Sequence, residues 1–113
     1  MPLAPASVVK EASLCLGVDE NNTPLGVSNT FPANTEKVGL FLRIAGAPAN
    51  TEIKLEWSHE GKLARRHLLI ATGDQKAITY IFPARAEFLQ PGTYDVAIKQ
   101  ADQLVGRLVF TIQ

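Results

Sequence analysis

The stretch that decides the fold is LQPGTYDVAI, residues 89–98. Pro91 fixes its own backbone φ, and Gly92 permits a turn that a residue with a side chain would find strained. From Tyr94 onward apolar and polar residues alternate, which is the period of a β-strand that buries one face. The stretch therefore predicts a tight turn that leads directly into a strand, with Tyr94 on the core side.

The same period of two runs through most of the chain. Alternating segments are separated by clusters of turn-forming residues at 19–24, 46–51, 72–76 and 100–103. The apolar phases of these segments predict the core positions Leu14, Leu16, Val18, Leu25, Val27, Phe31, Val38, Leu40, Leu42, Ile44, Ile53, Leu55, Trp57, Ile78, Tyr80, Phe82, Tyr94, Val96, Ile98, Leu104, Leu108, Phe110 and Ile112. About eight short strands arranged in this way predict an all-β, antiparallel sandwich.

The length of 113 residues corresponds to one domain. Residues 1–11, with two prolines among small side chains, are interpreted as a linker or N-terminal arm. The predicted domain is then 12–113. Only the segment 82–90 has the composition for one helical turn, and we expect it to carry the chain from one sheet to the other.

Composition argues against several classes of function. Lys plus Arg and Asp plus Glu both number 11, so the net charge is zero and no nucleic-acid partner is expected. No apolar run approaches the roughly 18 residues that span a bilayer, so we expect no membrane insertion by this segment. A single cysteine, Cys15, cannot form an internal disulfide or a cysteine-rich zinc site.

Two aromatic residues point to a fold family. Trp57 ends a mid-chain alternating run, and Tyr94 begins the penultimate run just after the turn. This combination resembles the immunoglobulin-like sandwich, in which a core Trp accompanies a tyrosine corner whose hydroxyl bonds the backbone a few residues upstream. The facing positions Leu42 and Val96 are aliphatic, so the closer resemblance is to fibronectin-type-III-like and bacterial immunoglobulin-like modules of surface or secreted proteins. It implies a single sandwich of about seven or eight strands and an extracytoplasmic location, periplasmic, cell-surface or secreted.

The segment KLARRHLL, residues 62–69, raises a question of register. If residues 60 and 61 form the hairpin turn, Arg65 lies opposite Glu56 and Arg66 faces inward beside Trp57. An inward arginine conflicts with a dry core. Either the register shifts, or this strand is an edge on which Arg66 covers the Trp57 ring. The edge interpretation is favoured.

One candidate interaction surface combines this basic cluster with aromatic residues, as sugar-binding and peptide-binding surfaces do. Its members are Trp57, Arg65, Arg66, His67 and Phe41, the last of which falls on an outward phase. The competing interpretation is core packing for Trp57 and solvated surface positions for both histidines, His59 and His67.

The remaining chemical candidates have simpler explanations. Glu52 and Glu56 suit cross-strand ion pairs better than a glycosidase pair. The acidic segment 19–22 suits a polar turn better than a calcium loop. Cys15 has no base placed beside it, so a small buried hydrophobe is expected rather than a nucleophile. No catalytic, cofactor-binding or metal-binding residue is predicted, and no cofactor.

The sequence therefore predicts a non-catalytic accessory or protein-interaction module of a larger extracytoplasmic or membrane-attached bacterial protein. Its partner would be another protein or the rest of a multidomain chain. The expected working surface is a sheet face or an unpaired edge strand, at 62–69 or 13–18. The alternatives are a carbohydrate-binding module, which needs two or three exposed aromatics on one face, and a structural subunit that assembles through edge strands.

Overall fold

A computed structural model describes residues 7–83 and 88–113, which fold into eight β-strands. The strands are β1 Val9–Cys15, β2 Gly17–Val18, β3 Pro24–Leu25, β4 Thr30–Phe31, β5 Val38–His59, β6 Lys62–Ile81, β7 Gly92–Gln100 and β8 Gln103–Ile112. Within these two ranges no helix is long and apolar enough to cross a membrane.

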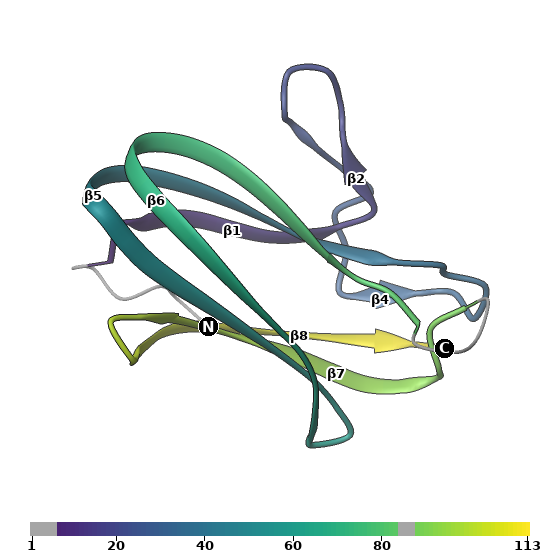
Figure 1. The fold of residues 1–113 in the computed structure, drawn as a ribbon. Coiled ribbons are helices and arrows are strands. Elements are labelled where there is room, and N and C mark those ends of the chain that lie inside the picture. The colour runs from purple at the N-terminus through teal and green to yellow at the C-terminus, as the bar shows by residue number, and fades with distance from the viewer. Residues whose placement is uncertain (1–6, 84–87) are drawn as a thin grey trace.

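The long hairpin of β5 and β6 organises both layers of the molecule (Figure 1). The first half of β5 pairs with β1 and with the second half of β6. The second half of β5 pairs with the first half of β6 and with β7, which pairs in turn with β8. β4 then adds to β8 in parallel, so the strand order is β1-β5-β7-β8-β4 with β6 on the other side of β5.

The predicted turn clusters 46–51 and 72–76 do not end strands. Gly46, Asn50 and Gly73 adopt positive φ values of 68°, 61° and 68° there, and the register of the β5–β6 ladder shifts. The two strands are nevertheless paired both before and after each irregularity. The clusters bend one continuous hairpin from the first layer into the second, where the sequence predicts separate strands.

The core lies between the two layers where the alternating pattern is cleanest. Val38, Leu40, Leu42 and Ile44 are at most 1 % exposed on one half of β5, as predicted. On the other half of β5 the side chains of Ile53, Leu55 and Trp57 are 0 % exposed, again as predicted. Strand β7 contributes the buried side chains of Tyr94, Val96 and Ile98. The alternation therefore predicted the central strands correctly.

The core prediction is wrong at positions outside the central strands. The side chains of Leu16, Leu25, Val27, Phe82 and Leu104 are exposed by 45, 50, 59, 50 and 43 %, respectively. β1 ends at Cys15, before the predicted run does, and the hairpin of β2 and β3 forms a separate small sheet. At the end of β6 the side chain that enters the core is that of Ile81, between the predicted Tyr80 and Phe82. A β-bulge between Ile98 and Lys99 changes which β8 residues face inward.

The outer face of the first layer carries a second buried group, which corrects the prediction for Phe41. Phe41 and Cys15 are 3 % and 0 % exposed, although both lie opposite the main core phase. Ile78 pairs with Phe41, and Gly39 leaves room for the Tyr80 ring, since a Cβ there would lie 2.9 Å from it. Burial raises the pKa of the Cys15 thiol. Phe41 is thus a packing residue and cannot present a surface to a partner.

The N-terminal boundary of the domain lies earlier than the predicted residue 12. β1 begins at Val9, and Val8 and Val9 are 8 % and 1 % exposed. The backbone N–H of Val8 and the Ser7 hydroxyl both donate to Oε1 of Gln100, at 3.0 and 3.3 Å. Residues 7–11 therefore belong to the sandwich. The rest of the predicted arm, and the middle of the predicted helical turn at 84–87, lie outside the described residues.

Candidate functional site

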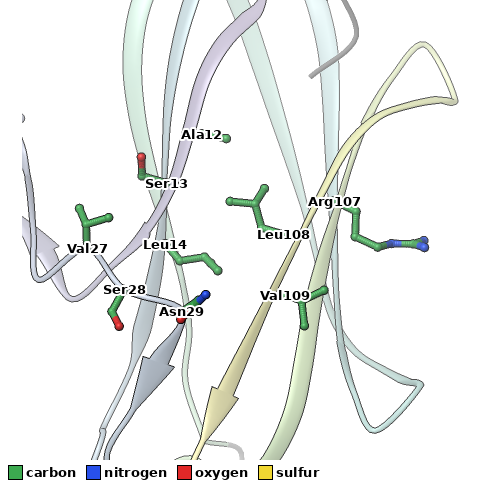
Figure 2. A pocket seen from close by; sticks show the side chains of 9 residues that line it. All are labelled: Ala12, Ser13, Leu14, Val27, Ser28, Asn29, Arg107, Leu108 and Val109. Atoms are coloured by element: carbon green, nitrogen blue, oxygen red, sulfur yellow. The ribbon is translucent and has the colours of Figure 1, made fainter. Parts of the chain in front are cut away.

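A groove of about 800 Å³ lies between the edges of β1 and β8. It is lined by residues 12–14 of β1, residues 27–29 of the loop that precedes β4, and residues 107–109 of β8. Figure 2 shows the Leu108 side chain directed toward β1, while Arg107 points away from the groove. Arg107 forms an ion pair with Asp95 at 3.2 Å instead.

The loop that precedes β4 bridges the two edges at one end of this groove. The N–H of Ser28 donates to the carbonyl of Leu14 at 3.2 Å, on the edge of β1. The N–H of Thr111 donates to the carbonyl of Asn29 at 2.9 Å, on the edge of β8. Two neighbouring loop residues are thus already hydrogen-bonded to the two edges.

The two edges continue beyond that segment with their backbone groups open. Residues of an antiparallel strand direct their backbone groups alternately to one neighbour and the other. Because Thr111 and Leu14 use theirs toward the groove, Val109 and Arg107 on β8 and Ala12 on β1 face it too. Within residues 7–83 and 88–113 no strand pairs with these groups. The groove therefore offers open backbone groups on both sides, from Arg107 and Val109 of β8 and from Ala12 of β1, beside the apolar side chains of Leu14 and Leu108.

A β-bulge between Trp57 and Ser58 shifts the register of the β5–β6 hairpin from the predicted one. Arg66 lies opposite Glu56 and pairs with it at 3.4 Å, on the outer face. Arg65 lies opposite Trp57. The predicted Arg65–Glu56 pair is therefore wrong, and so is the inward position of Arg66. The strand is nevertheless an edge, since β6 pairs only with β5 among the described strands.

His67, rather than Arg66, packs against the Trp57 ring, edge to face, with 6.4 Å between the ring centroids. The Trp57 indole Nε1–H lies 3.4 Å from Nδ1 of His67, and the Arg65 Nε–H donates to its Nε2 at 2.7 Å. Burial, and then the charge of Arg65, lowers the pKa of His67. Trp57 itself is 0 % exposed. The predicted interaction surface is thus reduced to Arg65, Arg66 and His67 along β6.

Two carboxylates of this face, Glu56 and Asp102, are held in ion pairs, whereas no ion pair joins Glu52 to a described residue. Glu56 accepts from the Lys99 ammonium at 2.6 Å, and this hydrogen bond is the main reason that the pKa of Glu56 is lowered. Asp102 accepts from Lys54 at 2.6 Å, which lowers the pKa of Asp102 and raises that of Lys54. Glu56 thus has the ion-pairing role that was expected of it.

The turn of LQPGTYDVAI is fastened by a hydrogen bond from Tyr94. Its hydroxyl donates to the Gln90 carbonyl at 2.7 Å. The ring stacks between His59, at 4.2 Å, and Phe110, at 4.9 Å between centroids. His59 Nε2 also lies 3.0 Å from the Pro91 carbonyl oxygen. His59 is therefore part of the corner, a role beyond the predicted solvated position.

The acidic segment 19–22 uses its carboxylate within the turn. Oδ1 of Asp19 accepts from the backbone N–H groups of Asn21 and Thr23, at 2.8 and 2.9 Å. In the part of the chain that the structure describes, no three His, Cys, Asp or Glu side chains lie close enough together to hold a metal ion.

Comparison with solved structures identifies the architecture. An immunoglobulin-like protein from Pseudomonas aeruginosa superposes with a TM-score of 0.66, and the match covers 98 % of each chain. The chain has an immunoglobulin-like fold. At 11 % sequence identity, this likeness extends to the fold of the immunoglobulin-like domain alone.

A second solved structure matches less well. It is a DNA-bound alkylpurine DNA glycosylase from Pseudomonas fluorescens, with a TM-score of 0.46, 12 % identity and coverage of 91 % of this chain and 30 % of that one. The likeness is too low to carry an argument. No protein family matches the sequence, and neither does any curated protein.

Proposed function

We propose that this immunoglobulin-like domain is a non-catalytic protein-interaction module that binds an extended polypeptide segment in the groove between β1 and β8. The supporting observation is the pair of open strand edges that face each other across an apolar floor. Strand addition uses such an arrangement, because main-chain hydrogen bonds provide affinity while alternate side chains provide specificity. At one end of the groove the chain's own residues Ser28 and Asn29 already bond the two edges, and β4, which follows them, adds to β8 as a parallel strand.

The groove favours a particular kind of peptide. Leu14 and Leu108 form its floor, and Val27, which is 59 % exposed, stands at its rim. A bound strand would direct every second side chain toward that floor. The partner is therefore proposed to be a segment with small or medium apolar side chains at alternate positions.

The larger context of the module is also a proposal. Its resemblance to modules of bacterial surface and secreted proteins supports a place in a larger extracytoplasmic or membrane-attached bacterial protein. The full reading frame, together with fractionation of cells that express it, tests this. A complete short frame whose product stays in the cytosol would contradict the proposed location.

Selection from a random peptide library, followed by hydrogen exchange on the best complex, tests the binding site. We expect binders with alternating apolar residues, and protection of the Ala12, Arg107 and Val109 amides in the complex. Val27→Asp should weaken binding about tenfold or more. Leu25→Asp is the matched control, since Leu25 is 50 % exposed and does not line the groove. Binders that leave these amides unprotected, or that tolerate Val27→Asp, would refute the proposal.

Carbohydrate binding is the second candidate, and one observation favours it. Tyr80 and Phe82 lie 5.9 Å apart at the end of β6, and Phe82 is 50 % exposed. However, the rings are tilted by 47°, and the Lys37 ammonium lies 4.4 Å from the centroid of the Tyr80 ring. Of these two rings only that of Phe82 is exposed, and the other exposed aromatic of the described residues is Phe88, at 38 %. Protein binding is therefore the better supported proposal. Glycan-array binding that Phe82→Ala abolishes would reverse this order.

A further inference from the structure

The first half of β6 is an open edge of the second layer, separate from the groove. β6 pairs only with β5 in the described part of the chain, whereas β5 continues into β7 and β8. Unpaired edge strands are templates for pairing with another chain, and proteins commonly protect them with proline, inward charges or bulges. From Arg65 to Ala71 this edge contains no proline, and its ladder with β5 is regular.

The direction of the backbone groups on this edge follows from the neighbouring ladder. The N–H of Glu60 donates to the Thr93 carbonyl of β7 at 2.8 Å. By alternation, even-numbered residues of this half of β5 bond β7 and odd-numbered ones, such as Leu55, bond β6. Leu55 lies opposite His67. The neighbouring residues Leu68 and Ile70 must therefore direct their N–H and C=O groups to the open edge.

The side chains of the same two residues are apolar and exposed. Leu68 is 59 % and Ile70 47 % exposed on the outer face, and Leu69 between them packs partly against the core. The ion pairs of this face involve β5, β7, β8 and Arg66, but not these two side chains. An apolar strip thus lies next to a row of unpaired backbone groups.

We propose that a second copy of this chain docks on this edge, as a two-fold antiparallel pair centred on Leu69. Residues whose backbone N–H and C=O groups point to the open edge can bond only those residues of the second copy whose groups do the same. This limits the possible registers. Centring on Leu69 places Leu68 opposite Ile70 of the second copy and, by symmetry, Ile70 opposite Leu68 of the second copy.

The alternative registers pair the edge less well. Centring on Arg66 sets two like charges directly opposite each other, which is destabilising. Centring on Leu68 sets Arg66 against Ile70 of the second copy. Centring on Ile70 sets Leu68 against Thr72 of the second copy. Only the Leu69 register therefore places both Leu68 and Ile70 opposite apolar side chains, so the edge is self-complementary. This self-complementarity favours a second copy over an unrelated extended peptide.

Sedimentation over a concentration series up to about 1 mM tests the association. We expect the weight-average mass to rise toward twice the monomer value. Leu68→Lys should keep it at the monomer value, because lysine suppresses edge pairing. Leu104→Lys, at a 43 % exposed position on β8, should not. A mass that stays at the monomer value throughout, or a dimer that Leu68→Lys leaves intact, would overturn the proposal.

Cross-linking tests the register. Directly opposed residues of a hydrogen-bonded antiparallel pair have Cα atoms about 5.5 Å apart, within the range of a disulfide. Oxidation of the double variant Leu68→Cys, Ile70→Cys should therefore yield a covalent dimer, whereas each single variant should not. The buried Cys15 is common to all three chains. Failure of the double variant, or equal dimer formation by a single one, would contradict the Leu69 register. Neither result bears on peptide binding in the groove, which Leu68→Lys should leave unchanged.

Discussion

Tyr94 connects two parts of the molecule that are distant in sequence. Its hydroxyl holds the turn before β7 through Gln90, while its ring lies between His59, at the end of β5, and Phe110 of β8. Burial raises the pKa of the phenol, which therefore stays a donor at neutral pH. The corner thus depends on one neutral hydroxyl group.

Removing that hydroxyl should leave the packing intact and the Gln90 carbonyl without its donor. Tyr94→Phe is expected to lower the free energy of unfolding by about 1–3 kcal/mol, measured by urea denaturation. Tyr80→Phe is a suitable control, because no hydrogen bond joins the Tyr80 hydroxyl to a described residue. Equal stability of Tyr94→Phe and the wild type would contradict the role of the corner.

His67 makes stability depend on pH. Its pKa is lowered in the folded state, first by burial and then by the charge of Arg65. The unfolded state therefore binds the proton more readily than the folded state. The stabilisation is fully present above the unfolded pKa of about 6.5 and is lost as pH falls through the folded pKa.

The free energy of unfolding should accordingly decrease as the pH is lowered from about 7.5 to about 5.5, a window that brackets the ordinary histidine pKa. In His67→Gln this decrease should be smaller, because glutamine does not titrate and its amide oxygen can still accept from Arg65. Urea titrations at several pH values measure both slopes. An identical slope in the two proteins would show that His67 is not responsible.

At this scale the sequence predicted residues better than it predicted their contacts. Trp57 and Tyr94 were recognisable because their residue types and positions define the corner and core of the fold. The contacts of His67 and Arg65 depend on the bulge after Trp57. One added residue in one strand changes every partner beyond it, and nothing in residues 52–71 locates that residue.

Among the elements, the connection into β7 imposes the strictest demand on a backbone position. Gly92 has a φ of 132°, and a Cβ there would collide with Oε1 of Glu60 and lie 2.8 Å from Nε2 of His59. Glu60 Oε1 accepts from the Thr93 N–H at 3.1 Å, so moving this carboxylate away from a Cβ would break that hydrogen bond. The φ of Gly92 is itself one that residues with a side chain rarely adopt, so both the backbone and its neighbours favour glycine here.

Gly92→Ala should therefore lower the free energy of unfolding by about 2 kcal/mol or more. Gly61 is the matched control: it also has a positive φ, 79°, but a Cβ there would meet nothing within 4 Å. Gly61→Ala should cost only the backbone strain, about 1 kcal/mol. Comparing the two variants by urea denaturation separates strain from collision. Equal losses would contradict the close approach at Gly92.

The bent strands show where reasoning about elements fails. Clusters such as GAPANT normally indicate that a strand ends. Here the two strands of the hairpin bend together around Gly46 and Gly73, and the ladder resumes at Thr51 and Ala71. Local composition indicates that the chain bends, but the pairing partner decides whether the strand also stops.

In the whole molecule, β5 and β6 belong to both layers, so neither layer can unfold alone. Trp57 is the single tryptophan and lies in the second layer. Its fluorescence should therefore follow the same urea transition as far-UV circular dichroism, which reports on all strands. Transitions with distinct midpoints would show that the layers separate.

The fold as a whole was predictable because alternation and turn signals persist over most of the chain. The groove was not. It exists because residues 16–29 leave the edge of β1, form the small β2–β3 sheet, and return to the edges only at Ser28 and Asn29. Alternation along the sequence does not show that these residues leave the sandwich. The exposed Leu16, Leu25 and Val27 were therefore wrongly assigned to the core.

Amide hydrogen exchange in the free protein tests whether β1 and β8 present open edges to a partner strand. We expect an alternating pattern along β8, with rapid exchange at Arg107 and Val109 and slow exchange at Leu108 and Phe110, whose amides bond β7. Uniformly slow exchange from Arg107 to Phe110 would mean that the edge is already covered, and it would exclude a binding groove between the two edges.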